Sequence, residues 1–572
     1  MDNYSVEYKK WFNFKELEQI YRTELESIKQ DEKEIHERFY APLSFGTAGL
    51  RGIMRAGING MNRYTVAQTT QGLSELIKEC GRTKDGVVIA CDTRNNSILF
   101  SEIAACVLAA NEIKVYLFDA PRPTPELSFA IRELNAVSGI NITASHNPKE
   151  YNGYKVYWDD GAQLSPDHAK VVSDRIQTLD IFSDIQTIDY KEAISLGKIV
   201  VIGKEIDEKY LSAVLAVRIS PQAIPKVADR FQVVYTPLHG TGRVLVPEVL
   251  KRAGLKHLYC VSEQMIPDGN FPTVKSPNPE NKSCFELAIK IAEEKGCDLL
   301  IGTDPDADRA GIVVKAENGE YVPLTGNQVG ALLIDYILER RKSQGQLPQN
   351  ACVIKSIVST ELADKICKEY GVTLLRVLTG FKFIGEKIKE FESTHEFTYI
   401  FGFEESYGYL PGTYARDKDA VSASLLITEM AAYYADLGMN LYDALLSVYE
   451  KYGYYIEDVE NIQLSGSDGI EKSKKLMKSL REKVPDVLGG VQLDSFSDYL
   501  SGKITQGGKT TETGLPSSDV LYYTFVDGNS VVVRPSGTEP KVKVYYMISG
   551  KTSLEAKEAL DRYKSAFSKL LD

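Results

Sequence analysis

A recurring order of strand, helix and strand constrains the fold of this chain more than any other feature of its sequence. Strands are expected at 87–90, 114–118, 232–235, 352–358 and 373–378, and helices at 101–111, 244–253 and 360–369. Strands joined by helices pair in parallel through right-handed crossovers. The sequence therefore predicts an α/β protein with three related α/β domains built on mixed or parallel sheets.

Three apolar runs end abruptly in polar clusters. Val137–Ile142 is followed by TASHN, Leu299–Gly302 by TDPDAD, and Thr398–Phe401 by GFEES. In open α/β sheets, ligands bind beyond the carboxyl ends of the strands. We therefore expect the three clusters to converge on one central cleft.

The two ends of the chain differ from this pattern. The first 40 residues are expected to be helical, and 501–518 is a polar, Gly-rich loop or hairpin tip. Two strands flank a loop at 534–540, and 553–571 has the period of an amphipathic helix with Leu554, Leu560, Tyr563, Phe567 and Leu570 on one side. The C-terminal part is thus predicted to be a smaller α+β domain.

Charge and composition exclude several classes of protein. The formal net charge of −12 argues against a nucleic-acid partner, which a basic face would bind. The eight cysteines form no C-x-x-C pair, and the six histidines have no zinc-type spacing. Charged residues occur throughout the first 16 positions, which argues against a signal peptide. No apolar run reaches the length of a membrane span. A protein of the cytoplasm, without a membrane partner, is expected.

Ser145 is the first candidate for chemistry. It lies in the sequence TASHNP, where Pro148 restricts the preceding residue to extended conformations and stiffens the loop. A serine held on a rigid loop at a strand end suits a nucleophile. An ordinary polar turn is the alternative. A Ser–His hydrolase is disfavoured, because no G-x-S-x-G sequence surrounds Ser145.

Asp304, Asp306 and Asp308 alternate in a segment that we expect to be extended and broken by Pro305. Carboxylates this close repel one another unless a hard divalent cation joins them. The glycine and distant glutamate of an EF-hand are missing, and three ligands leave room for a phosphoryl oxygen, which favours magnesium. A solvated acidic turn is the alternative, and the apolar run before Asp304 argues against it.

The sequence RPSGTEP at 534–540 has the composition of a phosphate site. Arg534 can bind phosphate with two parallel hydrogen bonds, Ser536 and Thr538 offer hydroxyls, and Gly537 allows an anion-binding backbone nest. A nucleotide P-loop is excluded, because no Walker lysine is present. A polar β-turn is the alternative.

Other segments give weaker signals. Glu404 and Ser406 follow a strand and offer oxygens to sugar hydroxyls. A solvated loop is the alternative, and these residues taken alone favour it. The remaining candidates are cations in short polar or Gly-rich segments: Arg51, Lys382, Arg416 and Lys418.

Together these segments resemble the α-D-phosphohexomutase family, and within it the phosphoglucomutases. TASHNP resembles the phosphoserine loop, DPDADR the metal loop, EESYG the sugar-binding loop and RPSGTEP the C-terminal phosphate loop, all in the family's order. The resemblance implies four domains around a deep cleft, which we expect at 1–205, 206–325, 326–452 and 453–572.

The resemblance also implies a mechanism. Ser145 would carry a phosphoryl group that passes between glucose 1-phosphate and glucose 6-phosphate through glucose 1,6-bisphosphate, the intermediate and activator. Asp304, Asp306, Asp308 and an oxygen on Ser145 would hold Mg²⁺, with Arg309 beside them. Lys155 aligns with a proposed proton-transfer residue, and His146 and Arg51 are expected at the same centre. The residues expected to bind substrate are Arg309, Lys382, Glu404, Ser406, Arg416, Lys418, Arg534, Ser536, Gly537 and Thr538.

The sugar loop departs from the family pattern at Phe403, where glycine is usual, and Tyr407 follows Ser406 as in glucose-type enzymes. Glucose is therefore favoured, with phosphomannomutase and phosphopentomutase activities as alternatives. Two further possibilities are a metal-dependent phosphatase and a non-catalytic sugar-phosphate-binding protein. The presence of Ser145 and all three aspartates argues against the binding protein. A monomer is expected from the resemblance.

Overall fold

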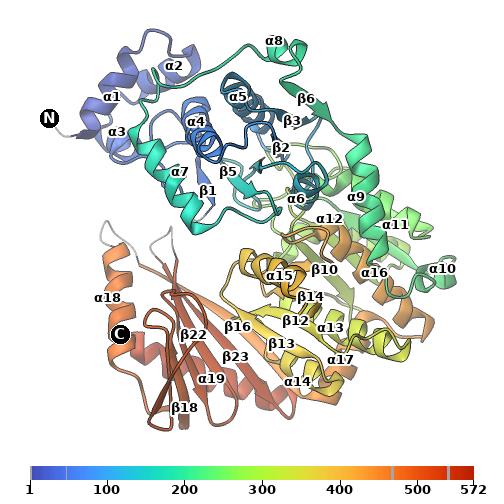
Figure 1. Ribbon diagram of the computed structural model, residues 1–572. Coiled ribbons are helices and arrows are strands. Elements are labelled where there is room, and N and C mark those ends of the chain that lie inside the picture. The colour runs from blue at the N-terminus through green and yellow to red at the C-terminus, as the bar shows by residue number, and fades with distance from the viewer. Residues whose placement is uncertain (1–2, 47, 465–468, 537–540, 572) are drawn as a thin grey trace. The chain divides into compact units, whose positions relative to one another are not determined.

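The computed structural model describes residues 3–46, 48–464, 469–536 and 541–571 (Figure 1). The chain divides into two compact units. Unit 1 comprises Met1–Leu324, Gly385–Ser393 and Gly408–Gly438, and unit 2 comprises Thr325–Ile384, Thr394–Tyr407 and Met439–Asp572. Three sheets are flanked by helices and a fourth is antiparallel, which confirms the predicted fold class.

The N-terminal segment forms three short helices, which are α1 (Asn3–Asn13), α2 (Gln19–Ser27) and α3 (Glu32–Phe39). Trp11 is fully buried among them. Its ring makes edge-to-face contacts with Phe39 of α3, and with Tyr64 and Phe182 of the following domain, at centroid distances of 6.0, 5.4 and 5.3 Å. Aromatic packing of this kind fixes the helices to the first sheet's domain.

The first sheet of unit 1 has the strand order β1-β5-β4-β2-β3-β6. Its strands are β1 (Gly49–Ile53), β2 (Val87–Cys91), β3 (Val115–Phe118), β4 (Ser138–Ile142), β5 (Tyr151–Trp158) and β6 (Ile199–Ile202). β4, β2, β3 and β6 run parallel, and β5 is antiparallel to both β4 and β1. The helices are α4 (Arg63–Glu79), α5 (Ser97–Ala110), α6 (Thr124–Glu133), α7 (Pro166–Thr178) and α8 (Tyr190–Ser195).

The second sheet of unit 1 has the order β11-β10-β9-β7-β8. Its strands are β7 (Gln232–Thr236), β8 (His257–Cys260), β9 (Leu299–Thr303), β10 (Ala310–Lys315) and β11 (Tyr321–Leu324). The helices are α9 (Lys204–Ala216), α10 (Ala223–Val227), α11 (Gly242–Arg252), η1 (Lys282–Phe285), α12 (Glu286–Lys295) and α16 (Ala420–Asp436). α16 packs against α10 and α11, so a segment distant in sequence completes this domain.

The third sheet lies in unit 2, where β13 (Thr373–Val377), β12 (Ala351–Ser356) and β14 (Thr398–Glu404) pair in parallel. The accompanying helices are α13 (Gly326–Ser343), α14 (Leu362–Tyr370) and α17 (Leu441–Tyr452). Two further elements, α15 (Lys382–Thr394) and β15 (Gly408–Leu410), belong wholly or largely to unit 1.

The C-terminal sheet is antiparallel, with the order β16-β23-β22-β21-β18-β19-β20 and β17 paired to β18. The strands are β16 (Tyr454–Gln463), β17 (Val487–Leu488), β18 (Val491–Asp498), β19 (Lys503–Gln506), β20 (Lys509–Glu512), β21 (Leu521–Phe525), β22 (Ser530–Pro535) and β23 (Lys541–Gly550). The segment 501–518 contains the hairpin β19–β20, turned by Gly507 and Gly508 at positive φ.

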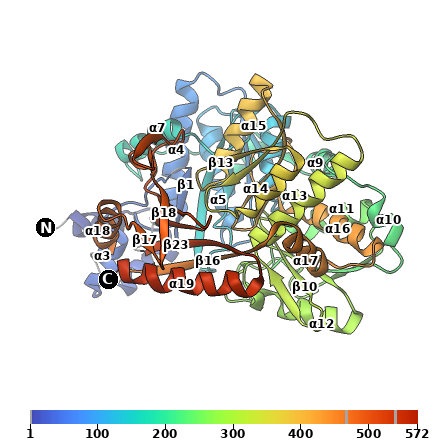
Figure 2. The ribbon, with the colours of Figure 1, turned by 90° about the horizontal axis from the view of Figure 1, so that it is seen from below.

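Two helices, α18 (Gly469–Glu482) and α19 (Ser553–Leu571), pack on this sheet. Figure 2 shows α19 running beside β23 and β16. Tyr563 and Phe567 are fully buried, as the amphipathic pattern predicts. Leu554, in the first turn of the helix, is 66% exposed. Within the described residues, no helix is both long and apolar enough to cross a membrane.

Candidate active site

Ser145 lies on the loop after β4, in unit 1. It is almost fully buried and adopts a φ of 51°, in the left-handed region that non-glycine residues rarely enter. Its amide donates to Thr143 Oγ1 over 2.8 Å, and its hydroxyl donates to Asp304 Oδ2 over 2.7 Å. The loop therefore turns the hydroxyl toward the second sheet's polar cluster.

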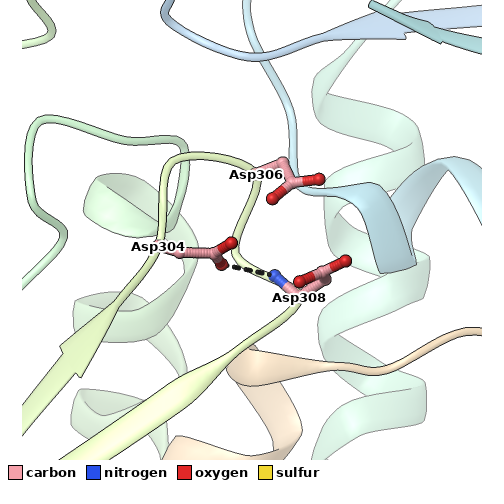
Figure 3. Close-up of side chains that lie close together, drawn as sticks. All are labelled: Asp304, Asp306 and Asp308. Atoms are coloured by element: carbon pink, nitrogen blue, oxygen red, sulfur yellow. Dashed lines mark hydrogen bonds between the residues drawn. The ribbon is translucent and has the colours of Figure 1, made fainter. Parts of the chain in front are cut away.

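Asp304, Asp306 and Asp308 lie in the connection between β9 and β10 (Figure 3). The expectation of an extended segment was wrong. The chain forms a tight turn in which the Ala307 amide donates to the Asp304 carbonyl and Ala307 adopts a φ of 50°. Asp304 Oδ1 accepts the amide hydrogens of Asp308 and Arg309. The turn brings all three carboxylates to one side instead of alternating them.

The three carboxylates have the geometry of a cation site. One oxygen of each lies within 4.8 Å of the others, and no other such group of His, Cys, Asp or Glu occurs in the described residues. Asp306 Oδ1 and Asp308 Oδ1 are buried and have no hydrogen-bond partner in the described structure. Burial and the neighbouring carboxylates raise the pKa of Asp304 well above its ordinary value. A hard divalent cation would offset the repulsion between the carboxylates and would coordinate the two oxygens that lack a hydrogen-bond partner. The three residues therefore fit such a cation.

Two lysines neutralise part of this negative charge. Lys155 Nζ, from β5, lies 2.9 Å from Asp306 Oδ2 and 3.6 Å from Asp308 Oδ2. Burial opposes its charge, but the two carboxylates outweigh burial and raise the pKa of Lys155. Lys418 Nζ lies 3.1 Å from Asp308 Oδ2 and 3.1 Å from Asp417 Oδ1. The structure thus brings Lys155 and Lys418 to the aspartate cluster.

His146 follows Ser145, and its Nδ1 is 3.2 Å from Ser145 Oγ. Burial, followed by the positive charge of Arg309, lowers the pKa of His146 well below its usual value. The imidazole is therefore neutral near pH 7, and one ring nitrogen can accept a proton.

The predicted arginines differ in their surroundings. Arg51 of β1 donates to Asn147 Oδ1 over 3.0 Å, beside the Ser145 loop. Arg309 forms an ion pair with Glu280 at 2.5 Å. The guanidinium of Arg416 is buried and donates to the carbonyl of Thr413 and the carboxylate of Glu392. Arg51 and Arg309 thus border the Ser145 and aspartate loops, whereas the guanidinium of Arg416 bonds its own loop and α15 and its amide donates to Ser128 of α6.

The sugar-loop candidates lie in unit 2. Glu404 is the last residue of β14 and is buried, and its Oε1 accepts the amide hydrogen of Gly380 over 2.7 Å. This bond ties 404–408 to the TGFKFIG segment at 379–385. Lys382 Nζ lies 4.8 Å from the centroid of the Phe383 ring, a cation–π distance. Ser406 is half-buried in the turn after β14.

The phosphate-loop candidates also lie in unit 2. Arg534 is at the end of β22, opposite Lys543 of β23. The Ser536 amide donates to the Lys541 carbonyl over 2.8 Å, which closes the base of the loop. Gly537 and Thr538 lie outside the described residues.

Sequence reasoning missed two residues of unit 1, one that bonds the aspartate loop and one that bonds the Ser145 loop. Thr124 begins α6, and its amide and hydroxyl donate to the carbonyl and Oδ2 of Asp306. Arg94 follows β2 and donates to main-chain carbonyls of the Ser145 loop. A signal for Arg94 was available, because the sequence Asp92-Thr93-Arg94 is another polar cluster directly after an apolar strand.

Family models match most of the chain. They are described as phosphoglucomutase/phosphomannomutase alpha/beta/alpha domain I at 42–181, domain II at 208–319, domain III at 325–452, and the C-terminal domain at 471–560. A phosphoglucomutase of Staphylococcus haemolyticus is 37% identical over 514 residues, 89% of this chain and 91% of that protein. One from Staphylococcus aureus strain MRSA252 is 39% identical over 518 residues, 90% of this chain and 91% of its own.

This chain belongs to the phosphoglucomutase/phosphomannomutase family. It is a phosphohexomutase, and the resemblance found in its sequence motifs is confirmed.

Solved structures share the phosphohexomutase fold. The open form of parafusin, a phosphoglucomutase from Paramecium, has a TM-score of 0.70 at 16% identity and covers 93% of this chain and 96% of its own. A family protein from Burkholderia thailandensis has a TM-score of 0.65 at 18% identity and covers 92% and 97%. The helices α1–α3 of this phosphohexomutase precede the residues that the domain I model matches.

Proposed function

We propose that this phosphohexomutase interconverts α-D-glucose 1-phosphate and glucose 6-phosphate, with Ser145 as the phosphoryl carrier and glucose 1,6-bisphosphate as the intermediate. The observation that carries the mechanism is the 2.7 Å hydrogen bond from the Ser145 hydroxyl to the buried aspartate cluster. The preference for glucose is supported by the two Staphylococcus phosphoglucomutases, which align over about nine-tenths of the chain.

The aspartate cluster is the proposed Mg²⁺ site. Asp304, Asp306 and Asp308 would hold the ion together with an oxygen of phosphorylated Ser145. When bound, Mg²⁺ supplies positive charge to the oxygens of the reacting phosphoryl group. The closely spaced carboxylates and the buried Oδ1 atoms of Asp306 and Asp308 support this assignment.

Each phosphoryl transfer requires one proton to move. When a sugar hydroxyl attacks phosphorylated Ser145, the P–O bond to Ser145 breaks, a P–O bond to the sugar forms, and the hydroxyl proton must reach the serine oxygen. We propose Lys155 and His146 for this relay. His146 Nδ1 lies 3.2 Å from Ser145 Oγ, and the Lys155 ammonium lies beside the same cluster.

The proposed sugar and phosphate contacts come from the loops at 404–408 and 534–540. Glu404 and Ser406 would accept or donate hydrogen bonds to sugar hydroxyls, and Arg534, Ser536, Gly537 and Thr538 would bind the phosphate that is not being transferred. A clamp on the remote phosphate orients the sugar and contributes binding energy to the reaction. The four domains proposed for this arrangement are 1–205, 206–325, 326–452 and 453–572.

Arg534→Ala is expected to raise KM for glucose 1-phosphate by about 10- to 100-fold, because hydrogen bonds to charged groups contribute about 1.5–3 kcal/mol. It should also release glucose 1,6-bisphosphate into solution during turnover. Steady-state kinetics and chromatography of the reaction mixture measure the two effects. Arg562→Ala, in the exposed part of α19, is the matched control. Kinetics of Arg534→Ala equal to those of the control would remove Arg534 from the phosphate site.

A coupled assay tests the proposed function. Glucose, mannose and ribose 1-phosphates are each supplied with Mg²⁺ and a trace of the corresponding bisphosphate, and formation of the isomeric phosphate is followed. The highest kcat/KM on glucose 1-phosphate is expected. A preference for mannose or ribose would change the substrate and keep the mechanism. Inorganic phosphate released in step with sugar turnover would replace the mutase by a phosphatase.

A further inference from the structure

The guanidinium of Arg94 bonds the Ser145 loop at main-chain carbonyls. Its side chain is fully buried at the end of β2. Nη1 donates to the carbonyls of Pro148 over 2.9 Å and Tyr151 over 3.2 Å, and Nη2 donates to the carbonyls of Ser145, over 2.5 Å, and Asn147. One guanidinium thus bonds four main-chain carbonyls of the segment 145–151.

The guanidinium is itself held in place. Asp92 Oδ1 accepts the Arg94 amide over 2.9 Å and the Ser97 hydroxyl over 2.8 Å, while Asp92 Oδ2 lies 3.3 Å from Arg94 Nε. The ring of Phe271 lies 5.0 Å from the guanidinium carbon. Burying a charge is costly unless it is paired and hydrogen-bonded. Asp92 provides the opposite charge, and the four carbonyls accept from the Nη atoms, whereas Nε and Asp92 Oδ2 have no hydrogen-bond partner in the described structure.

The contact with Ser145 matters because of that residue's backbone. A serine at a φ of 51° keeps this conformation only where its surroundings impose it. Fixing the Ser145 carbonyl fixes the peptide plane that follows the residue. With the Ser145 amide already bonded to Thr143 Oγ1, both sides of the Cα atom are held, and the hydroxyl points to Asp304.

We propose that Arg94 is a positioning residue that holds Ser145 in the left-handed conformation from which its oxygen exchanges the phosphoryl group. The proposal rests on the proposed role of Ser145. Arg94 touches no reacting atom in this scheme and acts through the main chain of the loop. Lysine cannot replace it, because a single ammonium cannot reach four carbonyls in the planar, forked arrangement of a guanidinium.

Arg94→Lys is expected to lower kcat about 100-fold, as for a misplacement of reacting groups by about 1 Å, while KM stays within about threefold. Intact-protein mass spectrometry measures the fraction of molecules in which Ser145 becomes phosphorylated by glucose 1,6-bisphosphate. These molecules are counted as competent sites, and kcat is expressed per competent site. A merely structural role would lower the number of competent sites and the Tm without changing the rate per site.

Arg22→Lys is the matched control, because Arg22 also donates to main-chain carbonyls, those of Phe12, Phe14 and Lys15, in the N-terminal helices. It should leave the rate per site unchanged. If Arg94→Lys does not fold, Asp92→Asn is tested in its place. We expect its rate per competent site to fall about tenfold, because the guanidinium loses its charged partner and is held less firmly. A rate per site within twofold of wild type in the folded variant would overturn the proposal. A wild-type chain that never phosphorylates Ser145 would instead overturn the proposed function.

Discussion

Ser145→Ala is expected to reduce mutase activity by at least about 10⁴-fold, because removing a catalytic nucleophile leaves only the contribution of binding and electrostatics. The change deletes one oxygen from a buried loop whose shape is set by main-chain contacts. The variant should therefore fold normally and still bind glucose 1-phosphate. Activity is measured by the coupled assay, substrate binding by calorimetry, and the phosphorylation state by intact-protein mass spectrometry.

Ser101→Ala is the control for this change. Ser101 is a buried serine of α5, and its hydroxyl donates to the Ser97 carbonyl away from the aspartates. It should retain full activity and a phosphorylated Ser145. Ser145→Ala that turned over at the wild-type rate, or that was still phosphorylated by glucose 1,6-bisphosphate, would assign the phosphoryl carrier to another residue.

Asp306→Asn should have the second largest effect. It keeps the size of the side chain and an oxygen able to accept the Thr124 hydroxyl, but it removes one negative charge from the cluster. We expect Mg²⁺ affinity and kcat/KM to fall by about 100-fold or more, since even the loss of groups that only support metal ligands costs about 10- to 100-fold. Calorimetric titration with Mg²⁺ measures the affinity directly, independently of turnover.

Asp268→Asn, in an exposed turn, is the matched control and should bind Mg²⁺ as the wild type does. Removing divalent ions with a chelator should abolish wild-type activity, and added Mg²⁺ should restore it. Unchanged Mg²⁺ affinity in Asp306→Asn would refute the proposed metal site. Unchanged activity after complete chelation would refute its participation in the reaction.

The sequence predicted best what is local. Strand ends are marked by a change from apolar to polar residues, so Ser145 and the three aspartates could be singled out by sequence pattern alone. Their proximity could only be expected, because it depends on how two sheets pack, and Ser145 and Asp304 are separated by 159 positions. The shape of the aspartate loop was missed because Ala307 adopts a left-handed conformation, for which alanine carries no sequence signal.

Arg94 was missed for a different reason. It follows an apolar strand within the polar cluster Asp92-Thr93-Arg94, a signal that was not used. Its contacts with carbonyl oxygens, which every residue has, leave no further mark in the sequence. Leu554 continues the apolar period of α19 into the first turn of the helix, yet its side chain is 66% exposed there. Periodicity reports which side of a helix is apolar, and tertiary packing decides how far along the helix that side is buried.

The aromatic packing around Trp11 has a consequence for where the first domain begins. The matched family region starts at residue 42, yet Tyr64 and Phe182, whose rings contact each other, both meet the Trp11 ring. A chain starting at residue 42 would expose these rings to water, and such an exposed apolar patch favours self-association. In this enzyme a segment outside the matched family region therefore completes the aromatic packing of the first domain.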